Sequence, residues 1–261
     1  MISQYLKGIW KDRFVLWSLV NKDLQNKYKR SALGIAWSII TPLGLVLIIG
    51  GVYTIIFGAD PKTFIPSLFA GLNPWLLINM SAEGGTMAFI SAEGYLKQTT
   101  VNAQIFPIRN MMVGFVNFLY SVLAFFSIYL FLQPQTFGPK MLLVIPGLVM
   151  LFVFVLSISN IASVVNLNVR DYQPLQSLIL QGIFYATPII FEPSMLDAKG
   201  FSIIYRINPV YYIIEVVRRP MLGKELPTAE TYIVAIGLVV ILFCLSVHLV
   251  MREKRKITFK L

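Results

Sequence analysis

Long stretches of this chain contain no charged residue, and they alternate with short segments in which the charges are concentrated. A helix of about 20 apolar residues is long enough to cross the roughly 30 Å hydrocarbon core of a bilayer. We therefore predict six membrane-spanning helices within residues 31–251, at 31–59, 63–90, 110–139, 141–169, 172–191 and 231–251. The second stretch holds a single acid, Glu83. The pattern predicts an all-α integral membrane protein with both termini on one side.

Lysine and arginine mark the side on which the termini lie. On that side the sequence places Lys7, Lys11, Arg13, Lys22, Lys27, Lys29, Arg30, Lys97, Arg109, Arg170, Arg252, Lys254, Arg255, Lys256 and Lys260, whereas basic and acidic residues nearly balance on the other side. Because cytoplasmic loops are enriched in basic residues, we predict cytoplasmic N- and C-termini. Only 13% of the residues are charged, against about 25% in soluble domains, and the net charge is +10. We attribute that charge to membrane orientation and expect no nucleic-acid partner.

Residues 1–30 form a cytoplasmic segment with an amphipathic pattern. Apolar residues recur every three or four positions within 4–24, at Leu6, Ile9, Trp10, Phe14, Trp17, Val20 and Leu24. This spacing predicts one helix lying in the membrane interface. Two interpretations stay open, a surface anchor and a helix that also gates the admission of a lipid-linked substrate. We expect no cleavable signal peptide, because these residues contain no uninterrupted apolar core.

The connection at 193–230 is long and apolar for a simple loop. We predict two short helices there, at 199–206 and 210–222, broken at Asn208-Pro209. They would re-enter the outer leaflet without crossing it and line a pathway, because irregular backbone at that depth needs protein or water around it. An ordinary extracytoplasmic cap is the alternative. Residues 252–261 form a basic cytoplasmic tail.

Motifs for covalent chemistry, nucleotide binding and metal binding are not found in the sequence. It has neither a G-x-x-x-x-G-K-[ST] loop nor an H-E-x-x-H motif, and it has one cysteine, Cys244, and one histidine, His248. We therefore expect no catalytic residue, no metal and no cofactor in this chain. If the protein uses ATP, the energy must come from a partner.

Residues 21–43 carry the most specific signal. They include Tyr28-Lys29-Arg30-Ser31, Leu33-Gly34, Trp37-Ser38 and Pro42, and further motifs follow in order: Phe106-Pro107, Val169-Arg170-Asp171, Thr187-Pro188-Ile189, and Asn208-Pro209 with Arg218. This series closely resembles the permease subunits of type-2 ABC exporters for O-antigen, teichoic acid and related polysaccharides. The resemblance covers nearly the whole chain. It departs from the family pattern at 93–104, where Lys97 stands in place of an Asn followed by two lysines.

The resemblance implies a homodimer in the bacterial cytoplasmic membrane, with two copies of a separate ATPase that hold ATP and Mg²⁺. The docking segment for the ATPase would involve Tyr95, Lys97, Ile105, Phe106 and Pro107. The substrate would be a glycan on undecaprenyl diphosphate, most plainly O-antigen, with teichoic acid and capsule as alternatives. Residues expected to handle it are Tyr28, Lys29 and Arg30 at the headgroup level, the aromatic residues Trp37, Tyr53, Phe57, Phe184, Tyr185 and Phe191, and Arg218 of the re-entrant segment.

Other functions remain open at this stage. A type-2 ABC permease for a drug or small lipid is the nearest alternative. A proton-coupled secondary transporter would use Glu83, which we expect instead to pair with a cation or a helix terminus near the cytoplasmic side. An integral-membrane glycosyl or acyl transferase would need an acidic or histidine-containing cluster that the sequence does not provide.

Overall fold

The computed structural model describes residues 1–29, 31–223, 225–254 and 256–261, and the side chains of Tyr28 and Phe57 lie outside this description. Every regular element in the described part is a helix: α1 (Ile2–Lys11), α2 (Arg13–Tyr28), η1 (Gly34–Ala36), α3 (Trp37–Phe57), α4 (Pro61–Thr86), α5 (Glu93–Gln98), α6 (Ile105–Leu132), η2 (Pro139–Leu143), α7 (Val144–Asn168), α8 (Tyr172–Ala186), α9 (Pro193–Asp197), α10 (Ile203–Arg206), α11 (Pro209–Met221), α12 (Ala229–Glu253) and α13 (Ile257–Lys260).

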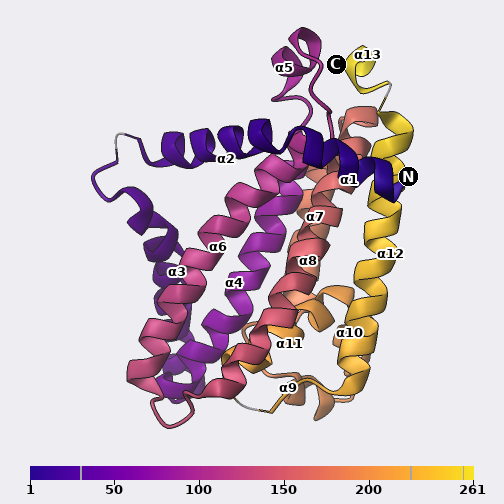
Figure 1. Cartoon of the computed structure of the whole chain (residues 1–261). Coiled ribbons are helices and arrows are strands. Elements are labelled where there is room, and N and C mark those ends of the chain that lie inside the picture. Colours follow the sequence, from indigo (N-terminus) through magenta and orange to yellow (C-terminus); the bar gives the residue numbers. More distant parts are fainter. Residues whose placement is uncertain (30, 224, 255) are drawn as a thin grey trace.

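The long helices run side by side, and α1 and α2 lie across one end of them (Figure 1). Both termini and α5 are found at that same end, which we call the terminal end. Helices α9, α10 and α11 lie at the opposite end, which we call the far end.

Within the described part of the chain, four segments are long and apolar enough to cross a membrane: Gly34–Ile56, Ile105–Leu132, Pro139–Asn168 and Ala229–Glu253. They coincide with the predicted first, third, fourth and sixth spans. The predicted second span corresponds to α4, a 26-residue helix that packs against α3, α6, α7, α8 and α11.

The predicted fifth span is shorter than expected. Its helix, α8, has 15 residues and ends at Ala186 instead of Phe191, which gives it a length of about 22 Å. Thr187 has an extended backbone because Pro188 follows it, and the residue before a proline is kept out of the helical region.

Small residues allow the central helices to approach closely. A Cβ atom at Gly85 of α4 would lie 2.8 Å from the backbone of Ser159 on α7. A Cβ atom at Gly147 of α7 would lie 2.2 Å from the carbonyl oxygen of Val216 on α11. Helix α7 is therefore packed backbone to backbone against both neighbours, as small residues permit in membrane helix bundles.

The amphipathic segment differs from the prediction of one helix over 4–24. It consists of two helices, α1 and α2, which meet at Asp12. The side chains that face the bundle are those of Tyr5, Asp12, Leu16, Leu19 and Val20, whereas Leu6, Trp10, Phe14 and Trp17 of the predicted stripe are exposed. The two helices meet at a residue that faces the bundle. The Asp12 carboxylate accepts hydrogen bonds from the backbone N–H and the side-chain amide of Asn102, which hold this polar position inward.

The far end confirms the predicted break at Asn208-Pro209. The Asn208 side chain accepts a hydrogen bond from the Val210 N–H and caps α11, which begins at Pro209. The preceding predicted helix, 199–206, is reduced to α10 because Gly200 adopts a positive φ of 77° that ends a turn. Helix α11 is largely buried against α4, α7 and α12.

Candidate functional site

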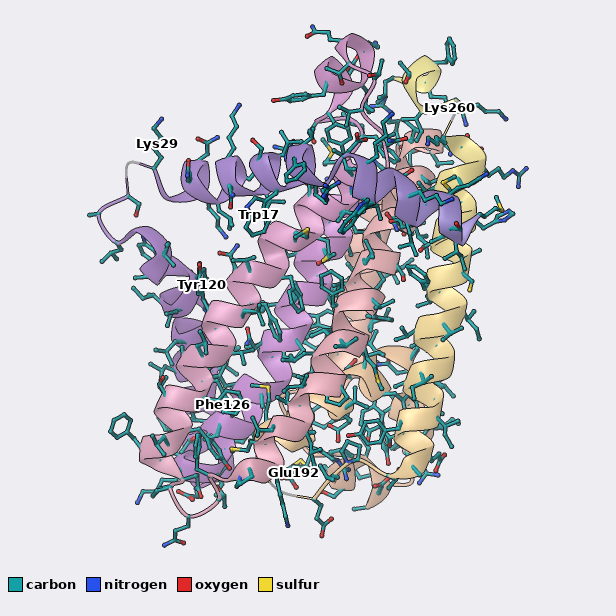
Figure 2. The ribbon with its side chains drawn as sticks, viewed as in Figure 1. Trp17, Lys29, Tyr120, Phe126, Glu192 and Lys260 are labelled. Atoms are coloured by element: carbon teal, nitrogen blue, oxygen red, sulfur yellow. The ribbon has the colours of Figure 1, made fainter. Side chains whose placement is uncertain are left out.

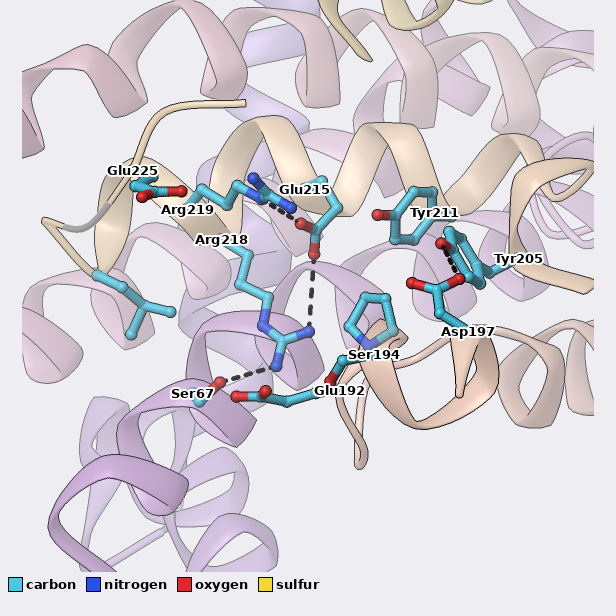
Figure 3. Close-up of a pocket in the computed structure, with 12 residues that line it drawn as sticks. Ser67, Glu192, Ser194, Asp197, Tyr205, Tyr211, Glu215, Arg218, Arg219 and Glu225 are labelled. Carbon is cyan, nitrogen blue, oxygen red and sulfur yellow. Dashed lines mark hydrogen bonds and ion pairs between the residues drawn. The ribbon is translucent and has the colours of Figure 1, made fainter. Parts of the chain in front are cut away.

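The far end contains a cavity of about 720 Å³ (Figure 3). We call it the Arg218 cavity. Its lining comes from α4, α9, α10, α11 and the segments around them, namely Ser67, Glu192, Pro193, Ser194, Asp197, Tyr205, Tyr211, Glu215, Arg218, Arg219, Leu222 and Glu225. A volume of this size is typical of ligand pockets, which span about 300–1,000 Å³.

Arg218 joins three parts of the chain at this cavity. Its guanidinium group donates hydrogen bonds to the Pro188 carbonyl oxygen (2.8 Å) and to the Ser67 hydroxyl (2.7 Å). Its Nη1 also lies 3.6 Å from a carboxylate oxygen of Glu215. Because Arg218 is only 6% exposed, these contacts are what makes burial of its charge tolerable.

Glu215 is shared by two arginines, since Arg219 Nε donates to its second oxygen at 2.7 Å. Glu215 is 4% exposed and Arg218 6%, whereas the Arg219 side chain is 37% exposed, so the triad joins a buried acid and a buried cation to a second cation at the surface. Burial, together with the negative charge of Glu215, raises the pKa of Tyr211 to about 12. The Tyr211 hydroxyl therefore stays protonated at neutral pH and faces the cavity as a neutral donor (Figure 3).

The motifs singled out in the sequence meet at this place. The Asn208 amide donates to the Thr187 hydroxyl at 2.6 Å, and Arg218 holds the carbonyl of Pro188. On the other wall, the Tyr205 hydroxyl donates to Asp197 at 2.8 Å. Residues that are distant in the sequence thus form one hydrogen-bonded frame around the cavity.

A second hollow of about 380 Å³ adjoins the first, and the two share Ser67, Glu192 and Arg218. We call it the aromatic groove, because Tyr53, Phe64 and Phe191 line it. The rings of Tyr53 and Phe64 stack with 6.4 Å between centroids and 16° between planes. Charged and hydrogen-bonding groups therefore lie on one side of Arg218, and flat apolar faces lie on the other.

Helix α8 exposes a row of polar side chains. Gln173, Ser177, Gln181 and Tyr185 are exposed and recur every four residues, which places them along one side of the helix. Where this row ends, at the C-terminus of α8, Phe184 packs between Tyr185 and Trp75 of α4, with centroid distances of 5.5 and 5.3 Å. The row leads from the terminal end toward the far end of the molecule.

At the terminal end, hydrogen bonds and an ion pair connect residues that are far apart in the sequence. Asp12 accepts two hydrogen bonds from Asn102, and Lys254 at the end of α12 donates to the Asn102 side-chain oxygen at 2.7 Å. Asp23 forms a two-point ion pair with Arg109, at 2.5 and 2.6 Å. Gln104 also donates to the Tyr5 carbonyl oxygen. Helices α1 and α2 are therefore fixed to the segment that connects α5 with α6.

Helix α5 projects at the terminal end and carries two of the predicted docking residues on its surface (Figure 1). Tyr95 and Lys97 are exposed, and Lys97 forms an ion pair with Glu93 that lowers the pKa of the Glu93 carboxyl. The other three predicted docking residues, Ile105, Phe106 and Pro107, are buried in the first turn of α6. The ring of Phe106 lies 6.2 Å from that of Tyr95, so the start of α6 packs against α5.

The remaining predicted residues lie in two groups. Tyr53, Phe191 and Arg218 meet at the far end, while Lys29 and Trp37 lie at the terminal end, where both are exposed (Lys29 is labelled in Figure 2). The Trp37 indole N–H donates to Ser31 at 3.1 Å. Arg30 and the side chains of Tyr28 and Phe57 lie outside the described residues.

Glu83 lies one turn before the end of α4, at the terminal end of the molecule, and is exposed. Its predicted position near that end is therefore correct. The described residues provide no ion pair for it, so the expected cation partner is not found among them.

Sequence reasoning missed several residues that the structure brings into these sites. Glu215 was detectable, because it precedes two arginines by three and four positions on a helix. The four-residue spacing of Gln173, Ser177 and Gln181 within an apolar stretch was a second signal. No sequence signal pointed to Ser67 or Asn102, because their hydrogen-bond partners are more than 80 residues away in the chain.

Comparison with known proteins decides the family. Residues 15–222 match the sequence model of the ABC-2 type transporters. The chain belongs to this family. Among ABC-2 relatives, it is 30% identical over 193 residues to an O-antigen export system permease protein RfbA of Klebsiella pneumoniae, and the match covers 74% of each chain.

A second relative of that name is similar at greater length. It is the O-antigen export system permease protein RfbA of Myxococcus xanthus, 25% identical over 226 residues and matched over 86% of each chain. The resemblance inferred from residues 21–43 and the later motifs is thus confirmed for the family. As members of a transporter family, such chains are permeases.

Proposed function

We propose that this chain is the membrane-spanning subunit of an ATP-driven exporter that moves a lipid-linked polysaccharide, O-antigen by preference, across the bacterial cytoplasmic membrane. Its relatives named as O-antigen export permeases support the substrate class. The terminal end would face the cytoplasm, as the basic residues predict, and the far end would face outward. Helices α4 and α8 would complete six spans, with α9–α11 as the re-entrant segment.

The polar row of α8 carries the proposal. Gln173, Ser177 and Gln181 are exposed although they belong to a helix of a predominantly apolar bundle. The Ser177 hydroxyl donates to the Gln173 carbonyl oxygen of its own helix at 3.2 Å, whereas the side-chain amides of Gln173 and Gln181 have no hydrogen-bond partner among the described residues. Such amides are unfavourable against lipid tails, because no hydrogen-bond partner is available there. They are satisfied where they line a hydrated pathway. In this position, the row would guide a glycan from the cytoplasm toward the aromatic groove and the Arg218 cavity.

The exposure of the α8 row also leads us to propose that two copies of the chain form the pathway. One protomer leaves the α8 row open on one side, so a closed pathway needs another wall. Two copies related by two-fold symmetry would supply it with the same face, which is the usual arrangement of homo-oligomers. The exposed, weakly packed helix α3, whose apolar window is only 17% buried, would complete the contact between protomers.

The terminal end would receive both the ATPase and the substrate. Helix α5, with Tyr95 and Lys97 exposed, fits the role of the docking helix. The diphosphate of the lipid carrier would be attracted by Lys29 and neighbouring cations at the headgroup level, where ionised hydrogen bonds to phosphate are strong. ATP and Mg²⁺ would bind to the two partner subunits, and this chain would be no enzyme.

Cross-linking tests the arrangement. In a Cys244→Ser background, Ser177→Cys and Gln181→Cys should form disulfide-linked or bismaleimide-linked dimers in native membranes. Ile241→Cys on α12 is the matched control, because it is 66% exposed and would face lipid. Dimers through Ile241→Cys but not through α8 would contradict the proposed pathway.

Purification tests the assignment as an ABC subunit. A tagged chain, solubilised in mild detergent from its native cells, should carry a nucleotide-binding ATPase in equal amount. A deletion of the gene should accumulate the lipid-linked glycan inside the cell, and the wild-type chain should restore export. A chain that purifies alone, and whose deletion leaves surface glycan unchanged, would contradict the proposal.

A further inference from the structure

The Arg218 cavity and the aromatic groove lie next to each other. They share Ser67, Glu192 and Arg218, so one extended ligand placed across Arg218 would contact both. Their volumes, about 720 and 380 Å³, place the combined space at the upper end of ligand pockets. This space is larger than a lipid headgroup requires and suits several linked rings.

The groups in this space match the two surfaces of a sugar. A pyranose presents hydroxyl groups around its edge and C–H groups on its faces. Ionised carboxylates are acceptors only, and they hold hydroxyl groups in a fixed direction. Glu192, Asp197 and Glu225 supply such acceptors, while Tyr53, Phe64 and Phe191 supply flat rings for the apolar faces.

The two arginines of the cavity are held by groups of the protein. Arg218 donates to Pro188 and Ser67 through its two terminal nitrogens and lies 3.6 Å from Glu215, and Arg219 donates to the same Glu215 through Nε. A phosphate group is held well by a guanidinium that offers both of its parallel N–H groups. Both terminal nitrogens of Arg218 are already bound, and Glu215 offsets the charge of Arg219, whose side chain is 37% exposed.

The described lining of the cavity is negative in sum. It contains four carboxylates, at Glu192, Asp197, Glu215 and Glu225, and two guanidinium groups, at Arg218 and Arg219. Glu192 and Glu225 take part in no ion pair among the described residues, and the exposed cation Arg206 lies outside the lining. Glu192, Asp197 and Glu225 are exposed, so a polyanion would meet the like charge of Glu192 and Glu225 at the surface of the cavity, and the repulsion would be strongest at low salt.

We infer that the Arg218 cavity and the aromatic groove are a saccharide-binding site selective for uncharged sugar units, so that the exported polymer is a neutral glycan and not a phosphate-bearing one. This inference rests on the proposed function. The two ends of the molecule would then recognise opposite parts of one substrate. The basic terminal end would take the diphosphate, and the far end would take only the sugar chain that follows.

A binding experiment tests the selectivity. The full dimer with its ATPase is placed in nanodiscs of zwitterionic lipid, and the affinities for a short dextran oligosaccharide and for a glycerol phosphate oligomer of the same length are measured at low salt. We expect the dextran to bind at least about tenfold more tightly. Equal binding, tighter binding of the phosphate oligomer, or no binding of the dextran overturns the inference.

A charge-neutralised variant identifies the cause of the selectivity. The triple substitution Glu192→Gln, Asp197→Asn and Glu225→Gln should weaken dextran binding and strengthen binding of the glycerol phosphate oligomer. Glu230→Gln is the control, since this acid lies in the first turn of α12 outside the lining, and it should leave both affinities unchanged. An unchanged preference in the triple variant also overturns the inference. Size-exclusion chromatography confirms that each variant remains a dimer.

The export assay keeps the two proposals apart. Restoration of surface glycan in the deletion strain does not depend on the probes used for binding. If export is restored but the phosphate oligomer binds as well as dextran, the inference fails and the exporter stands. If deletion leaves surface glycan unchanged, both fail together.

Discussion

A guanidinium group that is almost completely buried needs hydrogen-bond acceptors and an opposite charge nearby, and Arg218 illustrates how both are supplied. Its contacts reach the loop after α8, the hydroxyl of Ser67 on α4 and the carboxylate of Glu215 on its own helix. Lysine carries the same charge but ends in one compact ammonium group, which reaches only one of these places at a time. The residue is therefore a structural joint of the far end as well as part of a candidate site.

Arg218→Lys should lower the free energy of unfolding by about 2 kcal/mol, because two buried acceptors lose a charged donor. Thermal unfolding in detergent, followed by loss of the monodisperse dimer, measures the change. Arg206→Lys is the matched control, because Arg206 is exposed, and it should unfold like the wild type. Equal stability of the Arg218→Lys protein would show that Pro188 and Ser67 do not depend on the guanidinium group.

At Gln176 of α8, a substitution is expected to raise the stability of the protein instead of lowering it. It is 5% exposed, and among the described residues neither its amide nitrogen nor its amide oxygen has a hydrogen-bond partner. A buried polar group without a partner costs about 1–3 kcal/mol. Gln176→Leu should therefore raise the unfolding temperature in detergent, whereas Ser177→Leu on the exposed row should not. A lower unfolding temperature for Gln176→Leu would mean that the amide is held by a group from a second chain.

At the scale of elements, α1 and α2 are joined by side-chain contacts to the segment that runs from α5 to the start of α6. Asp12, between α1 and α2, is tied to Asn102, and Asn102 lies on the connection that follows α5. The ion pair of Asp23 with Arg109 fixes α2 to the start of α6 in the same way. If an ATPase displaces α5, these contacts carry the displacement to the helices that lie across the terminal end.

Asp12→Ala should separate ATP hydrolysis from export. The substitution removes both acceptor contacts to Asn102 while leaving α5 and its ATPase-facing residues intact. We expect the assembled complex to hydrolyse ATP at a rate near that of the wild type but to export roughly tenfold less glycan, equivalent to about 1.4 kcal/mol of coupling. Lys11→Ala, at an exposed neighbouring position, is the control. Parallel losses of hydrolysis and export would place Asp12 in assembly rather than in coupling.

The elements that follow from periodicity alone were predictable. Long charge-free stretches gave the four helices that are apolar enough to span a membrane, and Asn208-Pro209 gave the break before α11. The interface segment was only half predictable. Its apolar stripe predicts a helix in the membrane interface, and Leu6, Trp10, Phe14 and Trp17 of that stripe are exposed, but the division into two helices at Asp12 and the Asp12–Asn102 contact were not predictable. A contact over 90 residues leaves no local trace in the sequence.

In the candidate site, too, some residues could be predicted from the sequence and others could not. Arg218 and the motif residues around Thr187 and Asn208 were found through a family pattern, and the structure joins them by hydrogen bonds. The carboxylates Glu192, Asp197 and Glu225 looked like ordinary loop charges, because only the folding of three segments onto one another makes them a lining. Composition and spacing reveal which helices exist, whereas tertiary contacts decide which polar groups meet.

For the whole molecule, the two ends differ in chemistry as well as in shape. The terminal end carries the interface helices, α5 and the basic tail, and the tail packs back through α13, where Lys260 contacts Asn168 and Glu253. The far end carries the cavity with its negative lining. Such polarity along one axis suits a protein that receives its substrate on one side of a membrane and releases it on the other.

Protease accessibility tests this orientation. Cleavable tags at Met1 and at Leu261 should both be cut in inside-out vesicles and both be protected in intact spheroplasts, because the two ends of the chain lie together and the basic residues favour the cytoplasm. A third cleavage site inserted at Lys199, on the far end, should show the reverse. Cleavage of only one terminal tag in either preparation would contradict an even number of spans.

Asn102 contacts both Asp12 and Lys254, and this has a consequence for the order in which the contacts form during biosynthesis. A ribosome makes Asp12 early, but the lysine that completes the cluster emerges only after the last long helix has been made. Until then α1 and α2 have no finished platform to dock on. Their exposed Trp10, Phe14 and Trp17 suit a waiting position at the lipid headgroups. The set of contacts that holds the segment synthesised first is thus completed last, so a chain truncated before its last long helix would lack the Lys254 contact to Asn102.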